Sequence, residues 1–79
     1  MSEVKIVKTL DCKGLLCPLP VVKTFKAIRE MAVGEILEMI ATDPGAMPDM
    51  QAWANQTKHE LLESKDEGGV YRFLIRKTH

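Results

Sequence analysis

Two cysteines stand close together near the start of the chain, in the segment Asp11-Cys12-Lys13-Gly14-Leu15-Leu16-Cys17-Pro18-Leu19-Pro20. Cys17 directly precedes Pro18, and proline is favoured at the first position of a helix. The N-terminus of a helix carries unpaired N–H groups and a partial positive charge, which stabilise an anion. We therefore expect Cys17 at a helix start, with a lowered thiol pKa and a reactive thiolate.

Residues near Cys17 would orient its thiol and place positive charge beside it. Pro18 and Pro20 stiffen the turn and so fix the direction of the sulfur, and Lys13 could add positive charge. The alternative is that Cys17 is a small buried residue at a strand-to-helix turn, because free cysteine is commonly buried and inert.

The elements that must position this segment are predicted from hydrophobic periodicity. Residues 4–10 are expected to form a strand, with Val4, Ile6 and Leu10 on one side. A helix follows Pro18 and stops at Gly34. Its expected apolar face consists of residues at helical spacing: Val21, Phe25, Ile28 and Ala32.

The remaining chain predicts a second helix and three strands. Residues 35–42 are nearly all apolar and indicate a buried central strand. Pro48 and Asp49 can open a helix, whose end is not defined by periodicity because Leu61 continues the helical stripe. Glu67-Gly68-Gly69 indicates a hairpin turn, which needs a strand on each side, so residues 59–65 and 70–77 are expected to form strands. The helix has an apolar stripe of four residues: Met50, Trp53, Ala54 and Thr57. The order is βαβαββ, which predicts an α+β fold: a two-layer α/β sandwich, with a four-stranded mixed sheet and two helices on one face.

Length and charge exclude several classes of protein. The chain has 79 residues, with 11 basic and 11 acidic side chains, which allows one small domain over residues 1–79 and a site on its surface rather than an enclosed one. Zero net charge argues against a nucleic-acid binder. No apolar run approaches the ~20 residues of a membrane span. The N-terminus lacks a signal-peptide layout, so we expect a cytoplasmic protein without membrane insertion.

Metal binding is not expected from the residues that could act as ligands. The two cysteines are separated by four residues, which is a poor zinc spacing, and the histidines, His59 and His79, lie far along the chain. Four methionines spread over several elements suit core packing better than copper binding: Met31, Met39, Met47 and Met50. Trp53 is expected in the core, whereas His59 is expected to be solvated at the start of an exposed strand.

The cysteine segment resembles the signature of the TusA/SirA family of small sulfur-carrier proteins. That signature is Cys-Pro-x-Pro after a short loop that contains an acidic residue and Gly-Leu, and the matching residues are Asp11, Gly14, Leu15, Cys17, Pro18 and Pro20. The resemblance extends over essentially the whole chain, through Thr42-Asp43-Pro44-Gly45, Trp53 and the closing hairpin with Tyr71-Arg72-Phe73. It implies the four-stranded βαβαββ sandwich.

The resemblance implies that Cys17 accepts sulfane sulfur as a persulfide, or as a thiosulfonate, and passes it to another protein. Asp11, Gly14, Pro18 and Pro20 would support this motif. No cofactor and no metal are implied, and the chain would act as a sulfurtransferase-type carrier rather than as a stand-alone enzyme. The implied donor is a cysteine desulfurase or a rhodanese-like protein, and the implied acceptor is a DsrE-like protein. The pathway would be tRNA thiolation or sulfur oxidation and trafficking, served by a monomer without direct contact to nucleic acid.

Cys12 departs from family members that have only the motif cysteine. It could be an auxiliary thiol that forms a disulfide with Cys17, or a second residue that is loaded with sulfur. The third possibility is a residue at a strand end with no role in the chemistry. Loop geometry decides whether the two sulfur atoms can meet. A disulfide would make the protein a non-catalytic redox switch, which is the main alternative to a carrier; an RNA-binding module is a weaker one, because basic and aromatic surface patterning is lacking.

A basic edge along the first predicted helix is a candidate partner-binding surface. It consists of Lys13, Lys23, Lys26 and Arg29. Such charges are often only a solvated face. The functional interpretation is electrostatic steering toward acidic surfaces of partner proteins.

Overall fold

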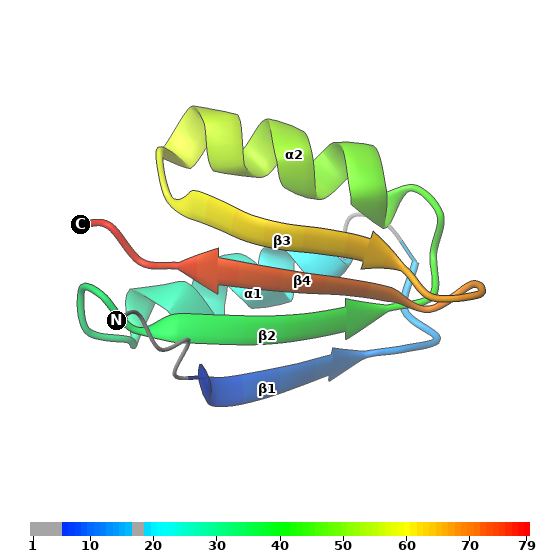
Figure 1. The fold of residues 1–79 in the computed structure, drawn as a ribbon, viewed down its shortest axis with the longest axis horizontal. Helices are drawn as coiled ribbons and strands as arrows, with labels where there is room; N and C mark the ends of the chain where they lie inside the picture. The colour runs from blue at the N-terminus through cyan, green and yellow to red at the C-terminus, as the bar shows by residue number, and fades with distance from the viewer. Residues whose placement is uncertain (1–5, 17–18) are drawn as a thin grey trace.

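A computed structural model describes residues 6–16 and 19–79, which form strands and helices in the predicted βαβαββ order (Figure 1). The elements are β1 (Ile6–Cys12), α1 (Leu19–Arg29), β2 (Ile36–Ala41), α2 (Ala46–Thr57), β3 (Glu60–Asp66) and β4 (Tyr71–Arg76). Cys17 and Pro18 lie outside the described residues. The order confirms the prediction from the sequence.

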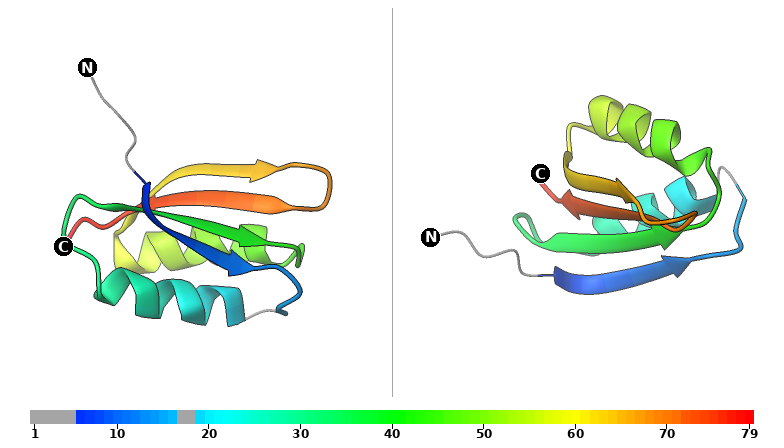
Figure 2. Two further views of the ribbon diagram at one scale, coloured as in Figure 1. Left: turned by 90° about the horizontal axis from the view of Figure 1, so that it is seen from below. Right: turned by 45° about the vertical axis from the view of Figure 1, so that its right-hand side comes forward.

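The strands form one mixed sheet in the order β1-β2-β4-β3. β1 pairs with β2 in parallel, whereas β4 runs antiparallel to both β2 and β3. Both helices cover the same face of this sheet, as the left view of Figure 2 shows. This is the predicted two-layer sandwich, and it follows from two crossovers of the same hand.

The core lies between the sheet and the helix layer. On β2, the helix-facing residues Leu37, Met39 and Ala41 are fully buried, which confirms the prediction of a central strand. Phe73 and Ile75 of β4 continue this surface. Further core side chains confirm the expected packing of methionines and tryptophan: Met31, Met50, Trp53 and Ala54, with Met47 half-buried beside them.

The predicted apolar face of α1 was partly wrong. Phe25 is 44% exposed and Ala32 is also exposed, whereas Thr24 and Ala27 are buried beside Ile28. Small residues allow the helix axis to approach the sheet closely, and the Thr24 hydroxyl is satisfied because it donates a 2.8 Å hydrogen bond to the carbonyl of Pro20. The helix is therefore rotated away from the face that the apolar residues alone predict.

Two helix boundaries also differ from the prediction. α1 ends at Arg29, several residues before Gly34. Gly34 instead has φ +95° in the turn that enters β2, where its N–H donates to the carbonyl of Lys77 at 2.7 Å. α2 begins at Ala46, so Pro48 lies inside its first turn rather than at its opening, a position where the missing N–H of proline is tolerated.

His59 is buried, with 8% of its surface exposed, so the expectation of a solvated histidine was wrong. Its ring stacks with Trp53 at 5.7 Å and with His79 at 4.5 Å between ring centroids. Its Nδ1 accepts a 3.2 Å hydrogen bond from the N–H of Thr78. His59 is buried because the C-terminal segment packs over the loop between α2 and β3, where Thr78 and His79 make hydrogen bonds to residues 57–59.

Candidate functional site

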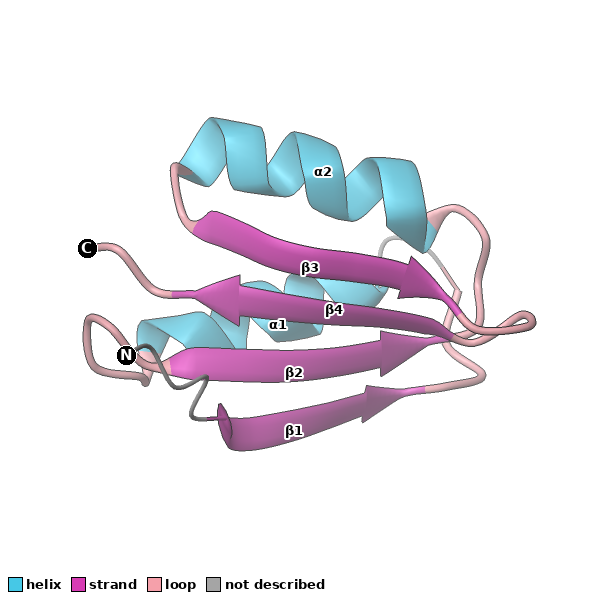
Figure 3. Ribbon diagram, viewed as in Figure 1, coloured by secondary structure: helices cyan, strands magenta, loops and turns pink. Residues whose placement is uncertain are grey.

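The cysteine segment joins β1 to α1 at one end of the sheet (Figure 3). The loop between β2 and α2 and the hairpin between β3 and β4 lie at the same end. The carboxyl ends of the parallel strands β1 and β2 meet there, which is where α/β folds commonly place their sites. Because Cys17 and Pro18 lie outside the described residues, the geometry of this site is that of the residues on either side of them.

The loop that precedes Cys17 is held in a defined turn. A side-chain oxygen of Asp11 accepts a 3.0 Å hydrogen bond from the N–H of Lys13. The N–H of Leu15 donates to the carbonyl of Cys12 at 3.2 Å. Gly14, with φ +83°, occupies the left-handed conformation that this turn requires. The two motif residues Asp11 and Gly14 therefore have local roles in shaping the loop.

A second hydrogen bond ties this loop to the rest of the fold. The N–H of Gly14 donates to the hydroxyl of Thr42 at 2.9 Å, and Thr42 is the first residue after β2. Sequence reasoning did not assign Thr42 to the site. The sequence did contain a signal for Thr42: a residue with a hydroxyl group directly follows a buried strand, at the end of the sheet where the neighbouring parallel strand also ends.

The chain on the far side of Cys17 is anchored by the start of α1. The N–H of Leu19 donates to the carbonyl of Leu16 at 2.9 Å, which links the two flanks. Pro20 is fully buried, so it fixes the first turn of the helix against the core. Leu16 and Leu19 are instead 71% and 47% exposed. The described residues on both sides of Cys17 thus present apolar surface to solvent.

Cys12 is a core residue at the end of β1, with 0% of its surface exposed. Burial raises the pKa of its thiol, Lys23 opposes this rise, and Asp11 adds to it. A buried neutral thiol is a poor nucleophile. This placement favours the structural interpretation of Cys12 and counts against a redox switch that needs it accessible.

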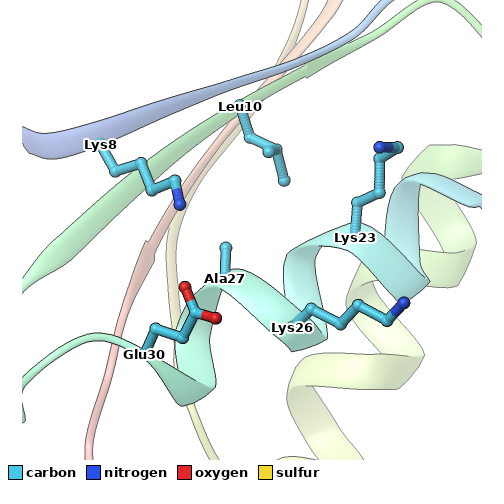
Figure 4. A pocket seen from close by; sticks show the side chains of 6 residues that line it. All are labelled: Lys8, Leu10, Lys23, Lys26, Ala27 and Glu30. Atoms are coloured by element: carbon cyan, nitrogen blue, oxygen red, sulfur yellow. The ribbon is translucent and has the colours of Figure 1, made fainter.

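Three of the four residues of the predicted basic edge lie along α1, where Lys23 and Lys26 line one hollow and Lys26 and Arg29 line a second. Lys23 and Lys26 line a groove between α1 and β1 together with Lys8, which sequence reasoning missed (Figure 4). Arg29 lies over the ring of Phe25, at 5.7 Å from its centroid. Lys13 is exposed in the loop before Cys17.

A metal centre finds no support within residues 6–16 and 19–79, where no group of three or more His, Cys, Asp and Glu side chains could hold an ion. In the same part of the chain, no helix is long and apolar enough to cross a membrane.

Comparison with known proteins identifies the family. A family profile described as Sulfurtransferase TusA matches residues 8–77, which include all or part of every helix and strand. The chain belongs to the TusA family of sulfur carriers.

Individual TusA-family relatives agree with this assignment. The chain is 51% identical over 69 residues to the sulfur carrier protein TusA of Allochromatium vinosum, covering 87% of this chain and 91% of the relative. It is 51% identical over 70 residues to the putative sulfur carrier protein YrkI of Bacillus subtilis, covering 89% and 93% of the two chains. The crystal structure of a SirA-like protein from Desulfitobacterium hafniense has the same fold, with a TM-score of 0.80 at 23% identity over 92% of this chain and 100% of that one.

Proposed function

We propose that this protein carries sulfane sulfur as a persulfide on Cys17 and relays it from a donor protein to an acceptor protein. The observation that supports this most is the hydrogen bond between Gly14 and Thr42, which braces the loop that leads into Cys17 in a chain of the sulfur-carrier family. A thiol on a braced loop at a helix start can be presented to a large partner without an enclosing pocket.

The proposed chemistry is thiol exchange without net oxidation. The Cys17 thiolate attacks the outer sulfur of a donor persulfide, a new S–S bond forms, and the donor thiolate leaves with the electron pair of the broken bond. An acceptor thiolate then attacks the outer sulfur on Cys17, and the Cys17 thiolate leaves in turn. Each step makes one S–S bond and breaks one.

The described residues would support this exchange by positioning the loop and by offering a docking surface. Asp11 and Gly14 shape the turn, and the buried ring of Pro20 holds the start of α1. Pro18 would restrict the backbone directly after the thiol. The exposed side chains of Leu16 and Leu19 would be covered by a partner during transfer.

The partners would be other members of a sulfur relay. A cysteine desulfurase or a rhodanese-like protein would donate, and a DsrE-like protein would accept, with tRNA thiolation or sulfur oxidation as the end point. Residues 1–79 would work as one domain and as a monomer. A reducing compartment such as the cytoplasm would keep the thiol available between cycles.

Sulfur loading tests this proposal directly. The reduced protein would be incubated with a cysteine desulfurase and cysteine, and separately with thiosulfate or polysulfide, and then weighed by intact-protein mass spectrometry. We expect the mass of added sulfur in the wild-type chain and in Cys12→Ala, its removal by a reductant, and no addition in Cys17→Ser. A Cys17→Ser chain that loads as well as the wild type would overturn the proposal.

A further inference from the structure

An open groove runs between β1 and α1 on the helix side of the sheet. Lys8 and Leu10 point into it from β1, and α1 contributes the other lining residues: Lys23, Lys26, Ala27 and Glu30 (Figure 4). The lining thus holds three lysines and one glutamate. Within the described part of the chain, none of these three lysines is in an ion pair. The groove therefore presents a net positive charge above an apolar floor formed by Leu10 and Ala27.

The same groove borders an unpaired strand edge. β1 is the first strand in the sheet order and pairs with β2 alone among the described strands. An edge strand presents a row of N–H and C=O groups that another extended chain can pair with. A segment added along β1 would direct every second side chain toward α1, because strand side chains alternate between the two faces. Those side chains would meet the three lysines.

We propose that this edge and groove bind an extended acidic segment of a sulfur-relay partner, which adds to the sheet as a further strand beside β1. Backbone hydrogen bonds would supply much of the affinity in this mode, and the side-chain positions would supply the specificity. Carboxylates of the segment would lie against Lys8, Lys23 and Lys26, and its apolar groups would cover Leu10 and Ala27. The inference rests on the proposed function only in assigning the segment to a sulfur donor or acceptor.

A second copy of this chain fits the edge less well than an acidic segment does. If two β1 strands paired with each other, the lysines that line one groove would face those of the other copy. Like charges on neighbouring strands are destabilising. The charge of the groove therefore favours a partner of opposite charge.

Binding can be measured without any sulfur transfer. The full chain, labelled with ¹⁵N and free of sulfur, would be titrated with a capped peptide of about six residues that alternates glutamate and valine. We expect amide shift changes along β1 and the lysine side of α1, slower hydrogen exchange of β1 amides, and weaker binding at high salt. The same peptide with lysine in place of glutamate should not bind.

Variants of the groove decide which residues contribute. Lys8→Ala, Lys23→Ala and Lys26→Ala are each expected to weaken peptide binding about two- to fivefold, the range of exposed ion pairs. Lys65→Ala, on the opposite edge strand, is the matched control and should bind as the wild type does.

Several outcomes would overturn the inference. These are no binding at millimolar peptide, equal binding of the lysine peptide, shift changes that map away from β1 and α1, or lysine variants that bind normally. Binding of a short single-stranded RNA at this groove in preference to the acidic peptide would also replace the proposed occupant. Loading of Cys17 from polysulfide needs no protein partner, so it is measured on the same variants and separates failure of the groove from failure of the carrier function.

Discussion

Gly14 and Thr42 are joined by a hydrogen bond of 2.9 Å, from the backbone N–H of one to the hydroxyl of the other. It connects the loop after β1 to the first residue after β2, and these strands are parallel neighbours. The loop is also anchored by Cys12, which is buried in the core. The segment that leads into Cys17 is therefore fixed at two points before the chain reaches the thiol.

Removing the hydroxyl of Thr42 should slow sulfur loading. Thr42→Val keeps the shape of the side chain but leaves the N–H of Gly14 without this acceptor, at a cost of about 1 kcal/mol in unfolding free energy. If that energy positions the loop, loading from polysulfide should slow by about fivefold. The measurement is a loading time course by mass spectrometry.

Thr9→Val is the matched control for Thr42→Val. It removes a hydroxyl that donates to Glu38 at 3.0 Å on the opposite face of the sheet. We expect a similar small loss of stability and an unchanged loading rate. Equal slowing in both variants would show that the effect comes from stability rather than from the loop.

Gly14→Ala should affect both stability and loading. Gly14 has φ +83°, and a Cβ there would meet no atom within 4 Å, so the cost is backbone strain of about 1 kcal/mol rather than a clash. Gly68→Ala, in the β3–β4 hairpin with φ +74° and equally open space, carries the same strain. Urea denaturation should show similar losses for the two variants. Only Gly14→Ala should slow loading, and a normal rate in it would contradict a role for this turn.

Cys12 should be chemically inert in the folded protein. Its thiol is buried, and burial raises its pKa. We expect iodoacetamide to modify it near neutral pH only after denaturation. Cys12→Ala should keep sulfur loading and lose about 1 kcal/mol of stability through the small cavity, whereas Cys12→Ser should lose more because it buries a hydroxyl. Rapid alkylation of Cys12 under native conditions would contradict this account.

Stability should fall as the pH drops below about 6.5, the ordinary pKa of histidine. Burial lowers the pKa of His59, and the neighbouring His79 and Lys77 lower it further. As the pH falls, His59 therefore binds a proton at a higher pH in the unfolded chain than in the folded chain. The contribution of neutral His59 to the free energy of unfolding is complete above its pKa in the unfolded chain, and it is lost as the pH falls toward its pKa in the folded chain. Protonation would also remove Nδ1 as the acceptor for Thr78.

Urea denaturation at pH values between about 7.5 and 5.5 measures this effect. His59→Phe keeps an aromatic ring beside Trp53 and should reduce the pH dependence. Arg72 lowers the pKa of Glu38, so the stabilising contribution of that carboxylate is lost only at more acidic pH. An unchanged pH dependence in His59→Phe would contradict the assignment.

Strong local patterns account for the parts of the fold that could be predicted. The apolar run of residues 35–42 indicates a central strand, and β2 does pair with a strand on each side, β1 and β4. The turn at Glu67-Gly68-Gly69 indicates a hairpin, and the N–H of Glu67 does bond to the carbonyl of Val70 at 2.8 Å.

Long-range packing accounts for the parts that could not be predicted. The rotation of α1 depends on how closely Thr24 and Ala27 let it approach the sheet, which apolar periodicity does not encode. His59 is buried by residues about twenty positions further along the chain. At the site, the Cys-Pro-x-Pro segment could be recognised from the sequence. The hydrogen bond between Gly14 and Thr42 could not, because the two residues are 28 positions apart and only the fold brings them together.

The position of the added sulfur tests the central claim most directly. Lys13 lies between the two cysteines, so trypsin separates Cys12, in the peptide 9–13, from Cys17, in the peptide 14–23. The loaded wild-type protein would be alkylated, digested and analysed by tandem mass spectrometry. We predict the extra sulfur on the peptide of Cys17 alone. Extra sulfur on the peptide of Cys12, or a Cys12–Cys17 disulfide in place of a persulfide, would contradict the proposed carrier mechanism.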